Sequence, residues 1–366
     1  MRYIDVAVLG ATGAVGQKFI TLLENHPWFR VREVVASSRS AGKRYREAVT
    51  WIQNAPIPET VAGLTVRSLE DTLESGVLFS GLDSVVAGDA EQSYAEQGYL
   101  VISNSRNHRM DPRVPLVIPE INPEHLRLVD LQPWRGAIVT NPNCSTMFLA
   151  MALAPLHRAF GLRAVQVTTL QALSGAGYPG LPALGVMGNV IPYIDGEEEK
   201  IETETLKILG EPGEYGVNPA SVRVAAQCTR VPVVDGHTET VSVQLQQPAT
   251  VEEVRSVMES FRGMPQIQGL PFAPRQPLWI FDAADRPQPA RDLQVENGMA
   301  TLVGRLRPCP VLDYRMVLLG HNTVRGAAGA AILNAETIVH LGYLKEGRFD
   351  RQGCVDEPAA AYCVGA

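Results

Sequence analysis

The segment that most constrains the fold is the glycine-rich run Gly10–Gly16, GATGAVG, near the start of the chain. It follows a compact apolar run of strand length at residues 4–9 and precedes apolar residues at helical spacing over residues 17–24. Glycines let a backbone turn tightly and approach a pyrophosphate, whose charge the N-terminus of the following helix stabilises. The GxxGxxG pattern alone is a weak signal, but its position between a strand and a helix predicts dinucleotide binding. The cofactor contacts that we expect here are Gly10, Thr12, Gly13, Ala14 and Val15.

The first third of the chain alternates short apolar runs with helical patterns. The runs at residues 31–36, 82–87 and 100–103 have strand length, and residues 90–98 predict a helix that ends at a glycine. Strands separated by helices imply βαβ units. We therefore expect a Rossmann-like, doubly wound parallel sheet over residues 1–143.

The pattern changes at about residue 144. An apolar helix is expected at residues 147–156 and a charged helix at residues 196–209. A strand is expected at residues 164–172, which alternate and are rich in β-branched residues, and longer strands that look half exposed are expected at residues 222–226, 238–246 and 299–306. This part is typical of an α+β catalytic and dimerisation domain with a mixed sheet, over residues 144–321.

The last helical pattern is rich in alanine. A long helix is expected at residues 323–341, and the small residues at 326–331 permit close approach to another backbone. We expect this helix, at about residues 322–342, to pack back on the N-terminal domain. Residues 343–366 would form an irregular tail.

The residues after the second expected strand indicate which dinucleotide binds. An NAD site usually places Asp or Glu there to hold the ribose 2′-hydroxyl. This chain has Ser37, Ser38, Arg39 and Ser40 instead, with no carboxylate. A cation and hydroxyl groups would stabilise a 2′-phosphate, so the sequence predicts NADP.

Composition excludes several classes of protein. The 366 residues contain 32 Lys and Arg against 39 Asp and Glu, a net charge of −7, which argues against a dedicated nucleic-acid binder. The five cysteines form no CxxC pair and are widely spread, which fits a reducing cytoplasm better than a disulfide framework. No signal peptide or apolar run of membrane-spanning length is recognisable, and we expect no membrane or metal site.

Cys144 stands where a helix is expected to start. In the run Asn141–Thr146, NPNCST, Pro142 marks a break, two hydroxyl residues typical of helix starts follow the cysteine, and the apolar helix comes next. A helix N-terminus favours the thiolate, which is the nucleophilic form of cysteine. Since the other four cysteines lack this setting, Cys144 is the candidate nucleophile.

Two further residues have side chains suited to such a site. A thiolate nucleophile needs a base, and His237 lies in VVDGHTE at an expected turn between two strands, although a turn histidine is also common on ordinary surfaces. Arg230, seven residues earlier, could hold a substrate carboxylate through a bidentate pair.

Five motifs together indicate a family. GATGAVG, NPNCST, QALSGAGYPG, GEEEKIETET and RVPVVDGHTE occur in this order. They resemble the aspartate-β-semialdehyde dehydrogenase family, in particular its archaeal and fungal branch, from residue 6 to about residue 342. NPNCST, together with an arginine seven residues before a histidine, is the specific part of this resemblance.

The resemblance implies an activity. Members reduce L-β-aspartyl phosphate to L-aspartate β-semialdehyde with NADPH and release phosphate, in lysine, threonine and methionine biosynthesis, and they form homodimers or homotetramers. Cys144 then matches the nucleophile, His237 the acid/base, and Arg230 the clamp on the substrate α-carboxylate.

The resemblance also implies roles for residues that no local pattern singles out. Glu197 matches the acid that binds the substrate ammonium, although three adjacent glutamates leave its register open by one. Lys200 and Arg109 match the phosphate-binding cations, with Arg106 as a competitor for Arg109. The remaining matches are Gln171 and Asn143 for positioning the acyl group, and Ser174, Gly175, Gly177 and Asn322 for nicotinamide-side contacts.

Three alternatives remain open on this scaffold. A malonyl-CoA reductase would share the cysteine, the histidine and NADPH, but its substrate lacks the ammonium that Glu197 would bind. An N-acetyl-glutamyl-phosphate reductase fits GEEEKIETET and SGAGYPG poorly. A dinucleotide-sensing scaffold without catalysis would not need Cys144, Arg230 and His237 together.

Overall fold

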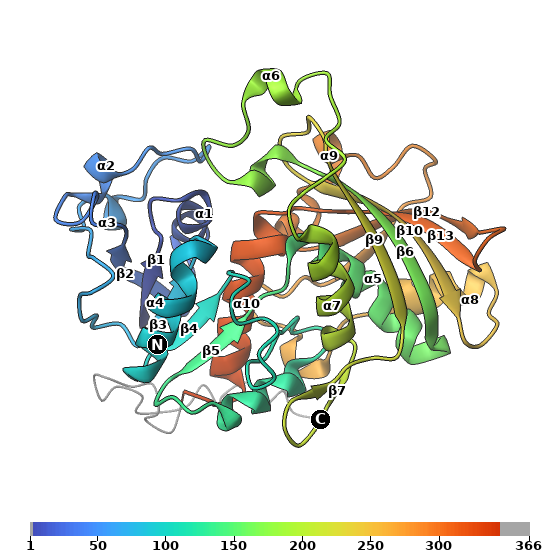
Figure 1. Cartoon of the computed structure of the whole chain (residues 1–366), viewed down its shortest axis with the longest axis horizontal. Helices are drawn as coiled ribbons and strands as arrows, with labels where there is room; N and C mark the ends of the chain where they lie inside the picture. The colour runs from blue at the N-terminus through green and yellow to red at the C-terminus, as the bar shows by residue number, and fades with distance from the viewer. Residues whose placement is uncertain (1–2, 345–366) are drawn as a thin grey trace.

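A five-stranded parallel sheet forms the N-terminal part of the computed structural model, which describes residues 3–344 (Figure 1). Its order is β2-β1-β3-β4-β5, and every neighbouring pair is parallel. The strands are β1 (Ile4–Leu9), β2 (Phe29–Val35), β3 (Val77–Ser80), β4 (Leu100–Ser103) and β5 (Ala137–Thr140). The helices of this part are α1 (Ala14–Leu23), α2 (Tyr45–Ala48), α3 (Glu59–Ala62), α4 (Ser84–Glu96) and the 3₁₀ helix η1 (Pro123–Leu131). The predicted doubly wound parallel sheet is confirmed.

One predicted strand is wrong. The run at residues 82–87 is not a strand: β3 lies earlier, at Val77–Ser80, and α4 begins at Ser84. The Asp83 side chain accepts a hydrogen bond from the backbone N–H of Val85, and this N-cap starts the helix. Apolar residues alone do not distinguish a buried strand from the first turn of a helix.

A six-stranded mixed sheet forms the second part. Its order is β11-β12-β13-β10-β6-β9, with parallel pairs at both ends and antiparallel pairs between them. The strands are β6 (Leu162–Gln171), β9 (Arg223–Arg230), β10 (His237–Leu245), β11 (Leu278–Ile280), β12 (Thr301–Pro308) and β13 (Tyr314–Gly320). A small hairpin pairs β7 (Glu211–Pro212) with β8 (Val217–Asn218). The predicted mixed sheet is also confirmed.

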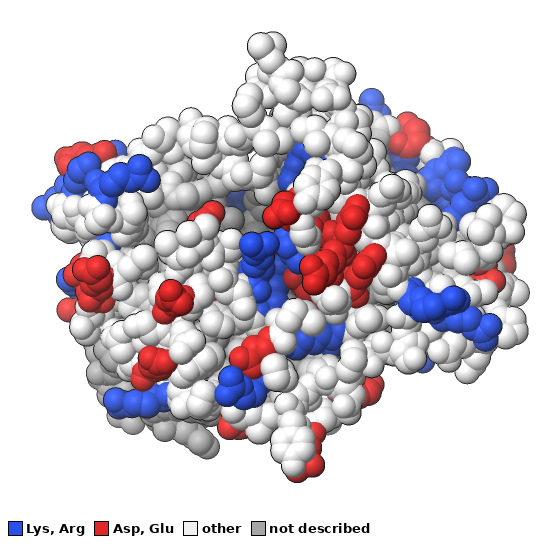
Figure 2. Space-filling view, viewed as in Figure 1, with Lys and Arg blue, Asp and Glu red and all other residues white. Residues whose placement is uncertain are grey.

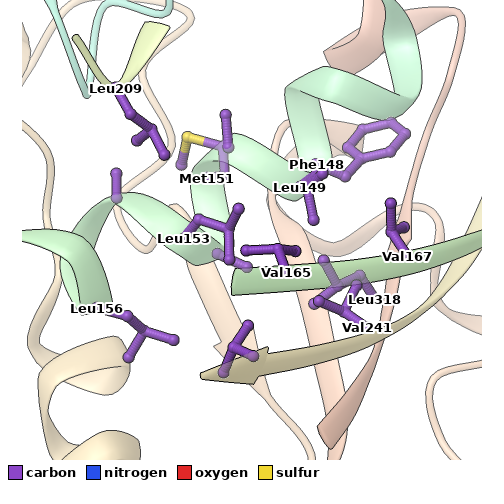
Figure 3. Close-up of a cluster of buried hydrophobic side chains, with 14 of the residues drawn as sticks. Phe148, Leu149, Met151, Leu153, Leu156, Val165, Val167, Leu209, Val241 and Leu318 are labelled. Atoms are coloured by element: carbon purple, nitrogen blue, oxygen red, sulfur yellow. The ribbon is translucent and has the colours of Figure 1, made fainter. Parts of the chain in front are cut away.

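Helices cover one face of the mixed sheet (Figure 1). The α-helices are α5 (Cys144–Phe160), α6 (Ala183–Val186), α7 (Glu197–Ile208), α8 (Val251–Ser260) and α9 (Pro289–Asp292). The short 3₁₀ helices are η2 (Leu173–Ala176), η3 (Pro265–Ile267) and η4 (Val295–Gly298). Helix α5 is buried along nearly its whole length, because it packs between this sheet and α7. Figure 3 shows Leu149 and Leu153 of α5 close to Val165 of the sheet, and Phe148 on the side of Val167.

The C-terminal helical segment lies against the N-terminal part. It starts as one π-helical turn, η5 (Val324–Ala328), and continues as α10 (Gly329–His340). Ala331, Ile332 and Ala335 of α10 belong to the same buried cluster as the side chains of the five-stranded sheet. Of the predicted tail at residues 343–366, all but residues 343 and 344 lie outside the described residues.

A buried ion pair anchors this C-terminal segment. Arg325 of η5 donates two hydrogen bonds to the Glu120 carboxylate, at 2.6 and 2.8 Å, and both side chains are fully buried. We predict that Glu120→Gln lowers the free energy of unfolding by about 3–5 kcal/mol, because it leaves a buried guanidinium without its counter-charge. Urea unfolding monitored by fluorescence measures this.

The matched control is Asp5→Asn, which breaks the exposed Asp5–Arg30 pair of β1 and β2. It should cost about 1 kcal/mol or less. An equally small effect of Glu120→Gln would contradict the anchoring role.

Candidate active site

The glycine segment has the geometry of a dinucleotide cradle. Gly10 has φ +71°, and a Cβ there would lie 2.7 Å from the carbonyl oxygen of Gly81. A Cβ on Gly16 would lie 2.2 Å from the Gly10 carbonyl oxygen. Gly13 is the exposed N-cap of α1 and no side chain caps that end of the helix. The backbone N–H groups of the first turn of α1 are therefore available to a phosphate, so these residues fit the predicted cofactor.

The predicted 2′-phosphate loop lies next to this cradle. Residues 37–40 follow β2 after one residue, Ala36, and β2 pairs with β1 in the sheet. Ser37, Ser38 and Arg39 are exposed, and the Ser40 N–H donates to the Ser37 carbonyl at 2.9 Å in a tight turn. The loop offers hydroxyl groups and a guanidinium, which suits an anion.

The candidate nucleophile is the first residue of α5. The Asn143 side chain caps the helix by accepting the backbone N–H groups of Ser145 and Thr146, at 2.9 and 3.2 Å. Cys144 is partly exposed. A Cβ on Gly326 would lie 2.7 Å from the Cβ of Cys144, so the π-helical turn of η5 presses its backbone against the nucleophile.

The ionisation of Cys144 differs from the expectation. Although Cys144 as a whole residue is partly exposed, desolvation of its thiol raises the pKa to about 12, and the nearby Glu197 carboxylate acts in the same direction. Arg109 and Arg230 lower the pKa but do not outweigh these two effects. The helix N-terminus does favour the thiolate, since the backbone N–H of Ser145 lowers the pKa, but desolvation outweighs this effect in the ligand-free protein.

Three predicted residues meet at one edge of the mixed sheet. Gln171 and Arg230 are register partners at the ends of the parallel strands β6 and β9. His237 starts the adjacent antiparallel strand β10, so its backbone begins where theirs end. Arg230 is nearly buried, and its Nη1 donates to the Ala172 carbonyl oxygen at 2.7 Å.

His237 is a neutral imidazole with a defined tautomer. It is fully buried, and burial, followed by the charge of Arg230, lowers its pKa to about 3. Its Nδ1 accepts the backbone N–H of Ala172 at 3.0 Å, so the ring proton is on Nε2. Among the described residues Nε2 has no hydrogen-bond partner. His237 therefore presents an unused donor.

The buried face of α7 supplies a carboxylate and an ammonium group. Glu197 Oε2 accepts from the side-chain amides of Asn143 and Gln171, at 2.8 and 3.1 Å. Its Oε1 accepts from Lys200 Nζ at 2.5 Å. Burial opposes ionisation of Glu197, but Lys200 and the two amides outweigh it and hold its pKa below the ordinary value. Glu197 is thus the member of the three-glutamate run that contacts other candidate site residues.

The two competing arginines have different surroundings. Arg109 is nearly buried, and its Nη1 donates to Glu204 Oε1 at 2.9 Å while its Nη2 donates to the Asn104 carbonyl at 2.7 Å. Arg106 is exposed, and its Nη1 and the Lys200 Cε both lie near Gly196. Figure 2 shows Lys and Arg side chains beside Asp and Glu side chains around a hollow in the middle of this face.

The predicted nicotinamide-side loop adjoins the same edge. Asn322 Nδ2 donates to Ser174 Oγ at 2.8 Å, and Asn322 Oδ1 accepts the N–H of Gly236 at 2.8 Å. A Cβ on Gly175 would lie 2.8 Å from Arg230 Nη1 and 3.1 Å from His237 Nε2. Gly177 has φ +74° and follows in the same loop. Any side chain at position 175 would collide with two candidate site residues.

The sequence motifs do not identify two residues of the site, Glu204 and Gly326. Glu204 contacts both Arg109 and the backbone of Asn143. Its spacing of seven residues from Glu197 puts both on one helix face, which is a signal that could have found it. Gly326 is recognisable in the sequence only as one of several small residues, and no local sequence pattern connects it with Cys144.

Other kinds of site are not found in the described part of the chain. Within residues 3–344, no group of three or more His, Cys, Asp or Glu side chains could hold a metal ion. Over the same residues, no helix combines the length and apolar character that crossing a bilayer requires.

Comparisons with known proteins identify the family of the chain. Residues 5–129 match the family model "Semialdehyde dehydrogenase, NAD binding domain", and residues 153–325 match "Semialdehyde dehydrogenase, dimerisation domain". The aspartate-semialdehyde dehydrogenase of Methanothermobacter thermautotrophicus is 50% identical over 343 residues, which cover 92% of this chain and 99% of that protein.

Two solved structures are also similar. The Candida albicans aspartate semialdehyde dehydrogenase with NADP superposes with a TM-score of 0.85 at 42% identity, covering 92% of this chain and 98% of that one. The Vibrio cholerae aspartate semialdehyde dehydrogenase II complexed with ASA gives a TM-score of 0.74 at 29% identity, covering 93% and 99%.

The raised pKa of Cys144 predicts a pH profile for alkylation. Only the thiolate reacts, so in the ligand-free protein the rate of Cys144 modification by iodoacetamide should still rise up to about pH 10. A free thiol with a pKa of about 8.5 levels off earlier. Mass spectrometry of the peptide that carries Cys144 measures the rate. Peptide resolution is needed because backbone N–H groups lower the pKa of the partly exposed Cys309. A rate that reached its plateau below neutral pH would contradict the burial argument.

Proposed function

The chain belongs to the semialdehyde dehydrogenase family, and from this premise we propose that it converts L-β-aspartyl phosphate to L-aspartate β-semialdehyde with NADPH. The motif-based resemblance to this family is thereby confirmed. One observation carries the proposal: the thiol of Cys144 lies close enough to Arg109, Arg230 and Glu197 for their charges to shift its pKa. A substrate with an acyl phosphate, a carboxylate and an ammonium group requires cations, a carboxylate and a nucleophile in one place.

We infer how the substrate binds from the hydrogen-bond donors and charged groups that the protein's own contacts leave unused. Arg230 uses one Nη1 bond on Ala172, and its other N–H groups are available for the α-carboxylate. Glu197 supplies the carboxylate for the substrate ammonium. Lys200 and Arg109 bind the phosphate in this proposal, and the exposed position of Arg106 near Lys200 supports it as a third cation.

The first chemical step is acyl transfer to Cys144. The sulfur attacks the acyl carbon, a C–S bond forms, the C–O bond to phosphate breaks, and a thioester results. The proton of the thiol balances the proton that the departing phosphate gains. The side-chain amides of Asn143 and Gln171 keep the acyl group in line with the sulfur.

Substrate binding itself favours the reactive form of the thiol. The Glu197 carboxylate raises the pKa of Cys144 in the ligand-free protein. A bound substrate ammonium would offset that negative charge. The thiol would then ionise more readily when the substrate is present than when it is absent.

His237 acts first as a donor in this scheme. Its Nε2–H is buried and without a partner, and Nδ1 is occupied by a backbone N–H. A neutral donor of this kind can stabilise, through a hydrogen bond, the oxyanion that develops on the acyl oxygen, and it keeps its proton. We therefore assign His237 the donor half of the predicted acid/base role.

The residues of the glycine segment and the loop at 37–40 would hold NADP, with Ser174, Gly175, Gly177 and Asn322 on the nicotinamide side. When bound, NADPH supplies the hydride that reduces the thioester to the aldehyde level. The complex of the Candida albicans relative with NADP supports this cofactor. Gly175 contributes by having no side chain, because its backbone lies directly against Arg230 and His237.

We also propose a domain division and an assembly. The division runs at residue 143, between the end of the parallel sheet and α5, with the C-terminal helix returning to the first domain. The match to a dimerisation domain supports a homodimer or homotetramer. Exposed residues at alternate positions of β9, namely Arg223, Ala225 and Gln227, supply a sheet surface that a second copy could cover.

Site variants test the proposed activity. Cys144→Ala should abolish NADPH oxidation with β-aspartyl phosphate, because no other group forms the thioester. His237→Asn should lower kcat by about 10²–10⁴-fold and leave measurable turnover, as for loss of one acid/base group. Cys309→Ser, on a partly exposed thiol between β12 and β13, is the control and should keep wild-type activity.

The same assay identifies the substrate. NADPH oxidation with β-aspartyl phosphate but not with malonyl-CoA is the expected result. Turnover of malonyl-CoA alone, or full activity in Cys144→Ala, would overturn the proposed function.

A further inference from the structure

We propose that Glu204 is a positioning residue that couples the phosphate-binding arginine to the nucleophile, an inference that rests on the proposed function. Glu204 lies on α7, on the helix face that carries Glu197, and is 1% exposed. Its two carboxylate oxygens bind two different parts of the site. It touches neither thiol nor substrate in this scheme and acts through its two partners.

The first partner is Arg109. Its Nη1 donates to Glu204 Oε1 at 2.9 Å, and its Nη2 donates to the Asn104 carbonyl oxygen. These two bonds fix the guanidinium plane and leave Nε, which is buried, without a partner in the described part of the chain. Glu204 thereby sets which edge of Arg109 remains unused.

The second partner is the N-cap of the nucleophile helix. The backbone N–H of Asn143 donates to Glu204 Oε2 at 2.6 Å. Asn143 precedes Cys144 directly, and its side chain caps α5 and binds Glu197. One carboxylate therefore relates the position of the sulfur to the position of Arg109.

A neighbouring residue on the same helix stiffens this arrangement. Lys207 Nζ donates to three backbone carbonyls, those of Arg109, Asp111 and Val114, at 2.7–2.8 Å. The backbone of the arginine loop is thus held by Lys207, and its guanidinium by Glu204. The two contacts together attach the loop that follows β4 to α7.

A glutamine cannot replace Glu204 in this role. An amide has one acceptor oxygen, so either Arg109 or the Asn143 N–H would face an NH₂ group instead of an acceptor. The guanidinium would also lose its buried counter-charge. Aspartate keeps both acceptor oxygens on a side chain that is one methylene shorter, so it should restore part of the function.

The variants are Glu204→Gln, Glu204→Asp and, as the matched control, Glu202→Gln. Glu202 lies on the same helix and also accepts a backbone N–H, that of Ala226, but it contacts no candidate site residue. Two measurements are needed. One is kinetics in the direction that consumes inorganic phosphate, with separate KM values for phosphate and NADP. The other is the concentration of inorganic phosphate that protects Cys144 from iodoacetamide, which requires no turnover.

We expect Glu204→Gln to raise both the phosphate KM and the protecting phosphate concentration by about 10- to 100-fold, as for an anion-binding group misplaced by ~1 Å. The NADP KM should not change, Glu204→Asp should fall between wild type and glutamine, and Glu202→Gln should match wild type. A purely structural role would lower thermal stability without this selective loss for phosphate.

Wild-type phosphate values in folded Glu204→Gln would overturn the inference. If that variant does not fold, the same result in Glu204→Asp, equal to wild type in both readouts, would overturn it as well. Failure of phosphate to protect Cys144 in the wild-type protein would also overturn it, since Arg109 would then hold no anion. If the wild-type protein does not turn over aspartyl phosphate, the proposed function fails, while the protection assay still tests Glu204.

Discussion

The buried carboxylate of Glu197 is the interaction on which the rest of the site depends. A buried charge is costly unless it is paired and fully hydrogen-bonded, and Glu197 is satisfied by Lys200, Asn143 and Gln171. These partners come from three separate segments: α7, the cap of α5 and the end of β6. Holding this one charge therefore brings the nucleophile helix, the mixed sheet and α7 to fixed relative positions.

The same carboxylate explains the state of the nucleophile. Its negative charge adds to burial and keeps the thiol of Cys144 protonated in the ligand-free protein, against the influence of Arg109 and Arg230. A protonated thiol is protected from unspecific oxidation and alkylation. The overall net charge of −7 thus describes the site poorly, because Arg109, Arg230 and Lys200 gather there around Glu197 and Glu204.

Local signals account for what could be predicted from the sequence. The strand β1, the glycine turn and helix α7 are encoded by apolar spacing, glycines and a charged helix face, and they lie within a few residues of their predicted bounds. The misassigned strand at residues 82–87 shows where such signals fail, since its apolar residues begin a helix. The four-residue strand β5 is not recognisable in the sequence, because such short runs acquire strand character only from their neighbours in the sheet.

The site was predictable as a set of residues but not in its electrostatics. The sequence motifs are sufficient to predict that Cys144, His237, Arg230 and Glu197 belong to the site. The thiol pKa depends on burial and on Glu197, which is remote in sequence, and the tautomer of His237 depends on the backbone N–H of Ala172. Such effects require distances that no linear pattern contains.

The most direct test of covalent catalysis by Cys144 is mass spectrometry of the protein mixed with β-aspartyl phosphate in the absence of NADPH. We expect an aspartyl adduct on the peptide that carries Cys144, released by hydroxylamine as a thioester and missing in Cys144→Ala. Protein that turns over aspartyl phosphate with NADPH, yet never carries an adduct on Cys144, would contradict covalent catalysis by this residue.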